Sequence, residues 1–253
     1  MRLEDCRVLS NERVATNTYL LRLLGKDIPR LAKPGQFVML KLGAPLDPLL
    51  RRPFSVFKAF EEEFWILYKE VGKGTSLMVQ LSTHQIVSVM GPLGNGFFSQ
   101  SGELHLLVGG GIGLAGIGLL EERLEGEKKV VLGFRCGTDV PSSLIKDHHL
   151  LFTEDGSMGV KGTVLDGIEQ ILLVNSGKRA LCLYACGSLG MLQAVSNLCR
   201  SLGIRCQVLM ESIMACGVGA CQGCVIKTTK GYKRACKDGP VFWEDQLIWD
   251  NST

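Results

Sequence analysis

The chain has 253 residues, of which 46% are hydrophobic and 21% are charged, and it carries a formal net charge of +3. This composition is typical of a globular protein, and the length is sufficient for two modest domains and a smaller appendage. So small a charge gives no reason to expect nucleic acid or a membrane surface as a partner.

The first hundred residues predict short β-strands separated by turn residues. The strand candidates lie at residues 6–10, 18–24, 36–42, 54–60, 63–71 and 85–91. Pro34-Gly35 and the acidic residues 61–63 are turns between them, and one helix is expected at residues 76–81. Regularly spaced strands with so little helix favour a small antiparallel β-barrel.

From about residue 101 the pattern changes to strands that alternate with helices. Strands are expected at residues 105–110, 129–135, 149–155, 180–187 and 205–212, and helices at 115–124 and 191–203. This alternation predicts a parallel α/β sheet. The uncharged run at residues 104–120 contains six glycines, so strand, turn and helix explain it better than a membrane span does.

The last part of the chain is dominated by clustered cysteines with the spacing C-x4-C-x2-C-x11-C. These are Cys216, Cys221, Cys224 and Cys236. The spacing of the first three cysteines matches the loop of a plant-type [2Fe–2S] cluster. Gly217, Gly219 and Gly223 are expected to allow the positive φ angles that such a loop needs. A hairpin at residues 225–235 would then bring the fourth cysteine back to the third.

Other interpretations of these cysteines are structural zinc and uncomplexed thiols. Zinc also accepts four thiolates, but its sites usually pair two short knuckles, whereas here three cysteines share one glycine-rich loop. The pattern therefore favours iron–sulfur. Five basic residues surround the hairpin, and they form either a solvated face or a field that raises the cluster potential or docks an acidic partner. They are Lys227, Lys230, Lys233, Arg234 and Lys237.

The remaining six cysteines are scattered among apolar residues and are interpreted as small buried side chains. They are Cys6, Cys136, Cys182, Cys186, Cys199 and Cys206. The N-terminal segment contains Glu4 and Asp5 and no apolar core, so no secretory signal is expected. A disulfide framework is therefore not expected either, and the compartment should be reducing, most simply the cytoplasm.

A flavin site is predicted in the barrel. In RRPFS, residues 51–55, Arg52 can fork onto a pyrophosphate and the Ser55 hydroxyl can reach a flavin ring nitrogen. Alone, the motif is also compatible with an exposed arginine before a strand. It gains weight from Gly72, Gly74 and Thr75, which open the expected helix and make its N-terminus a natural anion site.

A second nucleotide site is predicted at GGGIGLAG, residues 109–116. A glycine run can be simple turn chemistry, but a strand before it and a helix after it favour a pyrophosphate site. Cys186-Gly187-Ser188 follows the fourth strand and should lie at the same edge of the sheet, although Cys186 is equally compatible with a buried position. Thr153-Glu154-Asp155 ends the third strand, and its carboxylates favour NADH over NADPH, with Arg135 as the opposing argument.

The order of these motifs resembles the ferredoxin-reductase-like superfamily. It is most similar to the family of electron transfer subunits of type B dihydroorotate dehydrogenases, over essentially the whole chain. The most specific part is the C-terminal stretch MACGVGACQGCVIKT followed by RACKDGPVFWEDQLIW.

The resemblance implies a multidomain α/β plus β protein with three parts. These are an FAD-binding antiparallel β-barrel domain at 1–100, a parallel α/β NAD-binding domain at 101–210 and a small [2Fe–2S] module at 211–253. The implied FAD residues are Arg52, Pro53, Phe54, Ser55, Lys69, Glu70, Val71, Gly74 and Thr75. The implied NAD residues are Gly109, Gly110, Gly111, Gly113, Cys186 and Gly187, and the cluster ligands are the four clustered cysteines.

The implied function is electron transfer between NAD and an FMN-containing dihydroorotate dehydrogenase catalytic subunit, in pyrimidine biosynthesis. The expected assembly is a heterotetramer of two copies of each subunit. No catalytic residue is expected in this chain, and no partner is evident for its histidines, His84, His105, His148 and His149.

Two other functions fit parts of the pattern. One is an NAD(P)H-reductase subunit of a hydrogenase or of an NADH-dependent ferredoxin:NADP oxidoreductase. The other is a non-enzymatic binding protein stapled by zinc.

Overall fold

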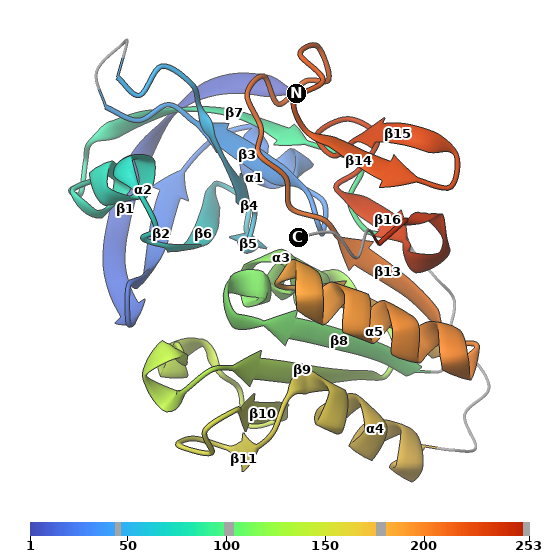
Figure 1. Cartoon of the computed structure of the whole chain (residues 1–253). Coiled ribbons are helices and arrows are strands. Elements are labelled where there is room, and N and C mark those ends of the chain that lie inside the picture. Colours follow the sequence, from blue (N-terminus) through green and yellow to red (C-terminus); the bar gives the residue numbers. More distant parts are fainter. Residues whose placement is uncertain (44–46, 99–103, 176–180, 250–253) are drawn as a thin grey trace.

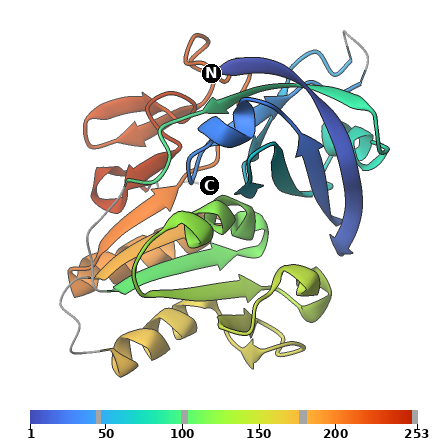
Figure 2. The same cartoon turned by 180° about the vertical axis from the view of Figure 1, so that it is seen from behind.

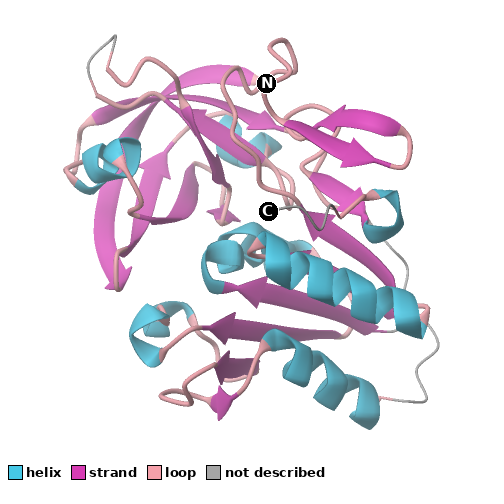
Figure 3. Ribbon diagram, viewed as in Figure 1, coloured by secondary structure: helices cyan, strands magenta, loops and turns pink. Residues whose placement is uncertain are grey.

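The computed structural model describes residues 1–43, 47–98, 104–175 and 181–249 of the chain. It contains two seven-stranded sheets and a two-stranded hairpin, arranged as a curled β domain, an α/β domain and a cysteine-containing module beside both (Figure 1). Figure 3 shows that the longer helices belong to the α/β domain.

The first sheet is antiparallel throughout and has the strand order β4-β3-β7-β1-β2-β6-β5. Its strands are β1 (Arg2–Ala15), β2 (Thr18–Leu24), β3 (Phe37–Leu40), β4 (Arg52–Ser55), β5 (Lys58–Ala59), β6 (Glu63–Lys69) and β7 (Ile86–Leu93). Two short helices, α1 (Ile28–Leu31) and α2 (Lys73–Val79), accompany them. Along β7 buried and more accessible residues alternate, as expected for a strand with one face on the core. The predicted antiparallel barrel fold is confirmed.

The second sheet has the order β11-β10-β9-β8-β12-β13-β16, and only its last pairing, β13 with β16, is antiparallel. Its strands are β8 (Leu104–Gly110), β9 (Lys128–Phe134), β10 (His149–Thr153), β11 (Val160–Lys161), β12 (Leu181–Cys186), β13 (Arg205–Leu209) and β16 (Val241–Trp243). Helices α4 (Val164–Val174) and α5 (Leu189–Leu202) pack on one face. Helix α3 (Leu114–Arg123) covers the other face and separates it from the barrel.

Short 3₁₀ turns complete the α/β domain and the tail. They are η1 (Gly111–Gly113), η2 (Gly137–Asp139), η3 (Ser142–Leu144) and η4 (Glu244–Gln246). In the part of the chain that the structure describes, no helix combines the length and apolar character needed to cross a bilayer.

The cysteine module bridges the other two parts. Its hairpin consists of β14 (Val225–Thr228) and β15 (Gly231–Arg234), and the chain then returns to the α/β sheet as β16. The view from behind shows the module lying next to both the barrel and the α/β sheet (Figure 2). Asn95, just after β7, donates to the carbonyls of Asp238 (3.1 Å) and Val241 (3.0 Å) and thereby ties the module to the barrel.

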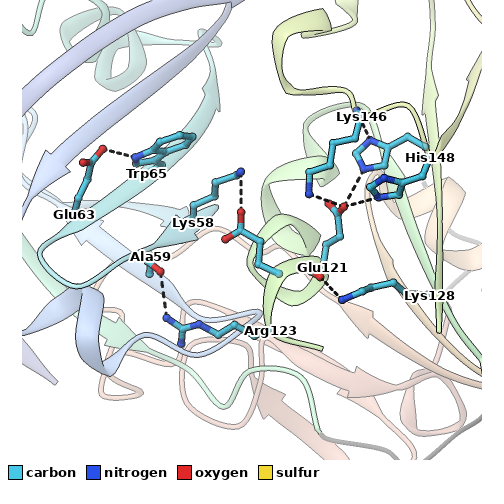
Figure 4. A network of polar contacts seen from close by, with 11 residues as sticks. Lys58, Ala59, Glu63, Trp65, Glu121, Arg123, Lys128, Lys146 and His148 are labelled. Atoms are coloured by element: carbon cyan, nitrogen blue, oxygen red, sulfur yellow. Dashed lines mark hydrogen bonds and ion pairs between the residues drawn. The ribbon is translucent and has the colours of Figure 1, made fainter. Parts of the chain in front are cut away.

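Helix α3 is anchored to both large domains at its C-terminal end (Figure 4). Glu122 pairs with Lys58 of the barrel at 2.8 Å, and Arg123 donates to the carbonyls of Ala32 and Ala59. At the tight crossing of α3 over the barrel, a Cβ on Gly118 would lie 2.2 Å from the Phe57 ring. The helix whose N-terminus carries the glycine run is therefore fixed from both sides.

The same helix end corrects the expectation that the histidines have no partners. One oxygen of buried Glu121 lies 2.7 Å from the Lys146 ammonium, 3.0 Å from His148 Nε2 and 3.1 Å from His149 Nε2. His149 Nδ1 accepts the Lys146 amide at 3.2 Å, which places the proton of a neutral His149 on Nε2, facing the carboxylate. Lys146 and the two histidines thus form one hydrogen-bonded cluster around the Glu121 carboxylate. His105 also has a partner, since its Nδ1 lies 3.3 Å from the Tyr184 hydroxyl.

Most predicted elements are confirmed, and the main differences are the following. The expected strand 54–60 is split into β4 and β5, and the expected helix 76–81 begins earlier, at Lys73. Helix α1 and helix α4 were not predicted. Strand β16 also places part of the tail in the α/β sheet, because Val241 pairs with Leu209.

Candidate functional site

The cysteine centre is assembled by the hairpin. The pairing of Val225 with Arg234 leaves Cys224 and Cys236 just outside the two paired strands, side by side. The Ala235 amide donates to the Cys224 carbonyl at 2.9 Å, which closes the end of the hairpin. The two cysteines are each only 2% exposed, whereas Cys221 is exposed, so the centre is buried on one side and open on the other.

Every sulfur of the centre accepts at least one backbone N–H. Cys216 Sγ accepts from the amides of Val218 (3.5 Å) and Cys221 (3.4 Å), Cys221 Sγ from Gly223 (3.4 Å), Cys224 Sγ from Cys236 (3.5 Å), and Cys236 Sγ from Gly219 (3.1 Å). Convergent amides stabilise thiolates and anionic sulfur clusters. Four thiols lined by amides therefore fit the predicted [2Fe–2S] group.

The acidities of the thiols reflect this environment. Burial raises the pKa of Cys216, but the amide donors of Cys221 and Val218 outweigh it and lower the pKa to about 6. For Cys236, burial comes first and the neighbouring thiols Cys224 and Cys216 add to it, raising the pKa to about 12. Cys224 and Cys216 therefore lie close enough to Cys236 to influence its acidity.

The loop needs left-handed backbone at three positions, but one of them differs from the prediction. Gly217 (φ +70°) and Gly219 (φ +80°) have positive φ as expected. Gly223 does not, and Gln222 has the third positive φ, +57°. The prediction for Gly223 was wrong because the turn occurs one residue earlier.

The centre packs directly on the barrel. Cys224 and Cys236 belong to one apolar cluster with Phe37, Met39 and Leu93 of β3 and β7. Strand β3 pairs on its other side with β4, which carries the predicted flavin residues. The cysteine centre therefore packs against a strand whose neighbour in the sheet carries the predicted flavin residues.

The structure brings together the two predicted parts of the flavin site. Arg52–Ser55 form the edge strand β4, and the Arg52 side chain lies against Gly74, where an added Cβ would be 3.1 Å from Arg52 Cγ. Thr75 acts on its own loop, because its hydroxyl accepts the amides of Val71 (2.8 Å) and Gly72 (3.0 Å).

The other three predicted flavin residues follow one another at the end of β6. Lys69 ends the strand, and its ammonium lies 3.7 Å from a carboxylate oxygen of Asp139 in the α/β domain. Glu70 donates its amide to the Asn17 carbonyl at 2.7 Å, and Val71 is 80% exposed. The residues that the resemblance implies thus line one side of the barrel, from β4 to β6.

A cleft of about 750 Å³ lies between the barrel and the carboxyl edge of the parallel sheet. The barrel contributes Thr18, Leu67 and Lys69, and the sheet edge contributes residues that follow β8, β9, β10 and β12. Clefts at this edge are the usual ligand sites of open α/β sheets.

The predicted NAD residues divide into two groups. Gly110, Gly111 and Gly187 line the cleft, where Gly111 is open and the Met191 side chain packs over the other two glycines. Gly109 and Gly113 lie beneath it, and a Cβ on Gly113 would be 2.0 Å from the Cys186 carbonyl oxygen. The Cys186 thiol is covered by Gly116, and its burial raises its pKa, so its side chain does not face the cleft.

Arg135 and Glu154, the residues of the NADH argument, both line the cleft. Asp155 is occupied locally, because its carboxylate accepts the Ser157 amide (3.0 Å) and hydroxyl (2.6 Å). The bonds from Ser157 lower the pKa of Asp155. Glu154 is thus the acidic group of this pair that is open to a ligand.

Sequence reasoning missed Asp139, Thr163 and Glu211, which also line the cleft. Glu211 follows β13, and the protein around it raises the pKa of its carboxyl by desolvation although it opens onto the cleft. A position just after a parallel strand was the signal that could have found it.

Comparison with known proteins agrees with this geometry. Residues 211–248 match the model of the iron-sulfur cluster binding domain of dihydroorotate dehydrogenase B. A solved structure of the NADH-dependent reduced ferredoxin-NADP oxidoreductase, described in the context of flavin-based electron bifurcation, is 27% identical with a TM-score of 0.82. It covers 96% of this chain and 90% of its own.

Two relatives carry the name dihydroorotate dehydrogenase B (NAD(+)), electron transfer subunit. The protein of Bacillus caldolyticus is 38% identical over 97% of this chain and 98% of its own length. That of Caldanaerobacter subterraneus subsp. tengcongensis is 36% identical over 96% and 97%. This chain therefore belongs to the family of dihydroorotate dehydrogenase B electron transfer subunits.

Proposed function

We propose that this chain transfers electrons between NAD and an FMN-containing dihydroorotate dehydrogenase catalytic subunit, in pyrimidine biosynthesis, with FAD and a [2Fe–2S] cluster as its cofactors. The observation that carries the proposal is the cysteine centre, in which four sulfurs accept backbone amides and which packs against β3, the neighbour of β4. The family membership supports the same function.

The cofactors would supply the electron chemistry, since FAD exchanges a hydride with nicotinamide and single electrons with a [2Fe–2S] cluster. The residues of this chain bind and orient them. Cys216, Cys221, Cys224 and Cys236 are the proposed cluster ligands, and the amides around them compensate the charge of their thiolates.

In the proposed flavin site, Arg52 would supply a fork of donors to a pyrophosphate, and its side chain packs on Gly74. Thr75 has a positioning role, because its hydroxyl fixes the loop at Val71 and Gly72. Pro53, Phe54 and Ser55 on β4, with Lys69, Glu70 and Val71 at the end of β6, complete the proposed site.

In the proposed nicotinamide dinucleotide site, Gly111 allows the ligand to approach the backbone, and Gly110 and Gly187 complete the surface together with the Met191 side chain that packs over them. Gly109, Gly113 and Cys186 support this surface from below, where Gly113 is in contact with the Cys186 carbonyl. Lys69 and Asp139 pair across the cleft and thereby connect its barrel side with its sheet side.

The proposed domain boundaries remain 1–100, 101–210 and 211–253, with β16 as an extension of the third domain into the sheet of the second. The proposed assembly is a heterotetramer of two of these chains and two catalytic subunits. Exposed Ile213 (90%) and Val218 (39%) near the cysteine centre are suitable for contact with a partner. The six cysteines outside the centre, five of them buried and none in a disulfide, support a reducing compartment, and we place the protein in the cytoplasm.

The test is reconstitution with a dihydroorotate dehydrogenase catalytic subunit of the family. The complex should reduce NAD⁺ with dihydroorotate, whereas the catalytic subunit alone should not. A matched complex with C224S in this chain should oxidise dihydroorotate with an artificial acceptor but lose NAD⁺ reduction.

A second candidate is the reductase subunit of an NADH-dependent ferredoxin:NADP oxidoreductase, favoured by the fold match with a TM-score of 0.82. Affinity purification distinguishes the two. Recovery of an FMN-containing dihydroorotate dehydrogenase subunit supports the main proposal, and recovery of a ferredoxin-reducing flavoprotein instead contradicts it.

A further inference from the structure

Arg234 differs from the other cations of the hairpin because its side chain joins two parts of the cysteine centre. It ends β15, two residues before Cys236. Its Nη1 donates to the Gly219 carbonyl at 3.0 Å, while Nε and Nη2 donate to the two carboxylate oxygens of Asp238 at 3.0 and 3.3 Å. The planar guanidinium therefore spans the glycine-rich loop and the turn that follows the hairpin.

The residue that Arg234 holds, Gly219, makes the shortest of the amide contacts to sulfur. Its N–H donates to Cys236 Sγ at 3.1 Å, compared with 3.4–3.5 Å for the other four. Gly219 is buried with φ +80°, and the Lys237 stem packs over it, since an added Cβ would lie 2.7 Å from Lys237 Cδ. A glycine in this conformation is restrained only by its contacts, and the Arg234 fork is one of them.

The backbone of Arg234 is equally well fixed. Its carbonyl accepts the amides of Lys237 (3.2 Å), Asp238 (2.8 Å) and Gly239 (3.2 Å), and its own amide donates to Asp238 at 2.8 Å. These bonds close the turn that contains Cys236. Arg234 thus connects a rigid turn that carries one sulfur with the loop residue whose amide contacts that sulfur.

Hydrogen bonds to cluster sulfurs raise the reduction potential of an iron–sulfur centre. We propose that Arg234 is a positioning residue that holds the Gly219 amide on Cys236 and thereby keeps the potential of the bound cluster high. This inference rests on the proposed function, because it requires a cluster at the four cysteines. The proposed effect on the reduction potential belongs to Arg234 and does not require the other basic residues of the hairpin to influence it.

The test compares four variants of the full chain carrying its cofactors, by EPR-monitored redox titration of the cluster. R234Q removes the fork and its charge, and R234K keeps the charge but cannot form the fork. D238N keeps the arginine but replaces the carboxylate that accepts its hydrogen bonds with an amide, which weakens this contact. K233Q is the matched control, because it removes a neighbouring charge of the same hairpin.

We expect the equilibrium constant for cluster reduction to fall roughly tenfold in both R234Q and R234K, which corresponds to about 59 mV for a one-electron couple. D238N should shift it in the same direction by less, and K233Q should change it little. An unchanged reduction potential in R234K, or a shift of the potential in K233Q as large as in R234Q, would mean that only charge matters and would overturn the proposal.

If the Arg234 variants fail to incorporate the cluster, D238N decides. A lower potential in D238N supports the positioning role, and an unchanged potential contradicts it. A wild-type chain without any cluster would instead refute the proposed function, so the two failures are distinguishable.

Discussion

The cysteine centre and the nucleotide cleft are held in different ways. The centre is formed within residues 216–236, and backbone amides of that same segment surround its sulfurs. The cleft is formed between two domains, and the interactions at its mouth include a 3.7 Å ion pair between Lys69 and Asp139 and one backbone bond from Thr16 to Thr138. A site whose ligands and hydrogen-bond donors come from one short segment has little freedom to move, whereas a site between two domains can adjust to its ligand when the domains shift.

This difference matters for function. A centre that transfers one electron works best when its surroundings change little between redox states, and short backbone loops meet that requirement. A cleft that admits and releases a dinucleotide needs surfaces that can separate slightly. Substitutions in the two regions should therefore affect different properties, and the following predictions test that separation.

The largest effect is expected for C224S. Because Cys224 is 2% exposed and its sulfur is one of the four proposed ligands, the variant should lose the cluster while keeping its flavin and the reduction of that flavin by NADH. Iron content and visible absorption measure this. C136S, outside the centre, is the control and should keep full iron. Loss of flavin together with iron in C224S would show that the two sites are not independent.

The next effect is expected for G113A, beneath the cleft. The new methyl group would lie 2.0 Å from the Cys186 carbonyl oxygen, so the glycine turn must shift, at a cost of about 1–3 kcal/mol. The KM for NADH should rise at least tenfold, with the cluster unchanged. G190A is the control, because a Cβ there meets nothing within 4 Å, and it should leave the KM as it is. An unchanged KM in G113A would contradict the predicted nucleotide position.

A pH-dependent effect is expected at Glu121, which anchors the other end of α3. Burial raises its pKa, but hydrogen bonds from His149 and Lys146 outweigh this and lower the pKa to about 2, from 4.5. Because the folded pKa is the lower one, the stabilisation is complete above about pH 4.5 and is lost as the pH falls toward 2. It amounts to something on the order of 3 kcal/mol.

The measurement is the melting temperature of wild type and E121Q at several pH values. Wild type should be the more stable at pH 7, and the difference should shrink as the pH approaches 3. A difference that stays constant over this range would show that the ion pairs of Glu121 contribute no pH-dependent stability.

The smallest effect is expected for E154Q. Removing the carboxylate open to the cleft beside Arg135 should reduce repulsion of a 2′-phosphate by about 1 kcal/mol, roughly a factor of five in the kcat/KM ratio of NADPH to NADH. D155N is the control, because the Asp155 carboxylate is bound to Ser157. An equal change in both variants would argue against a specific role for Glu154.

The same contrast explains what could be predicted from the sequence. The cysteine module was predictable in spacing and hairpin because its determinants are adjacent in the chain, from Cys216 to Cys236. The one error, Gly223 in place of Gln222, arose because a non-glycine residue takes a left-handed conformation there.

For the cleft, the glycines, Arg135 and Glu154 were predictable, because they end or follow strands of the parallel sheet. Lys69, Asp139 and Glu211 come from three distant segments, and no pattern in the sequence predicts that they line the same cleft. Helix α4 was missed although Thr163 and Asp166 form a capping box before it, a signal that was available in the sequence. Strand β16 forms because residues 241–243 pair with residues 207–209, and the sequence around it does not predict this pairing.

The most direct test of the account is an anaerobic titration of the purified chain with NADH, followed by visible absorption and EPR. The account predicts flavin and iron–sulfur absorption that both bleach with NADH, together with an EPR signal of a reduced [2Fe–2S] cluster. A colourless protein that holds zinc at its four cysteines, or a cluster that NADH does not reduce, would contradict it.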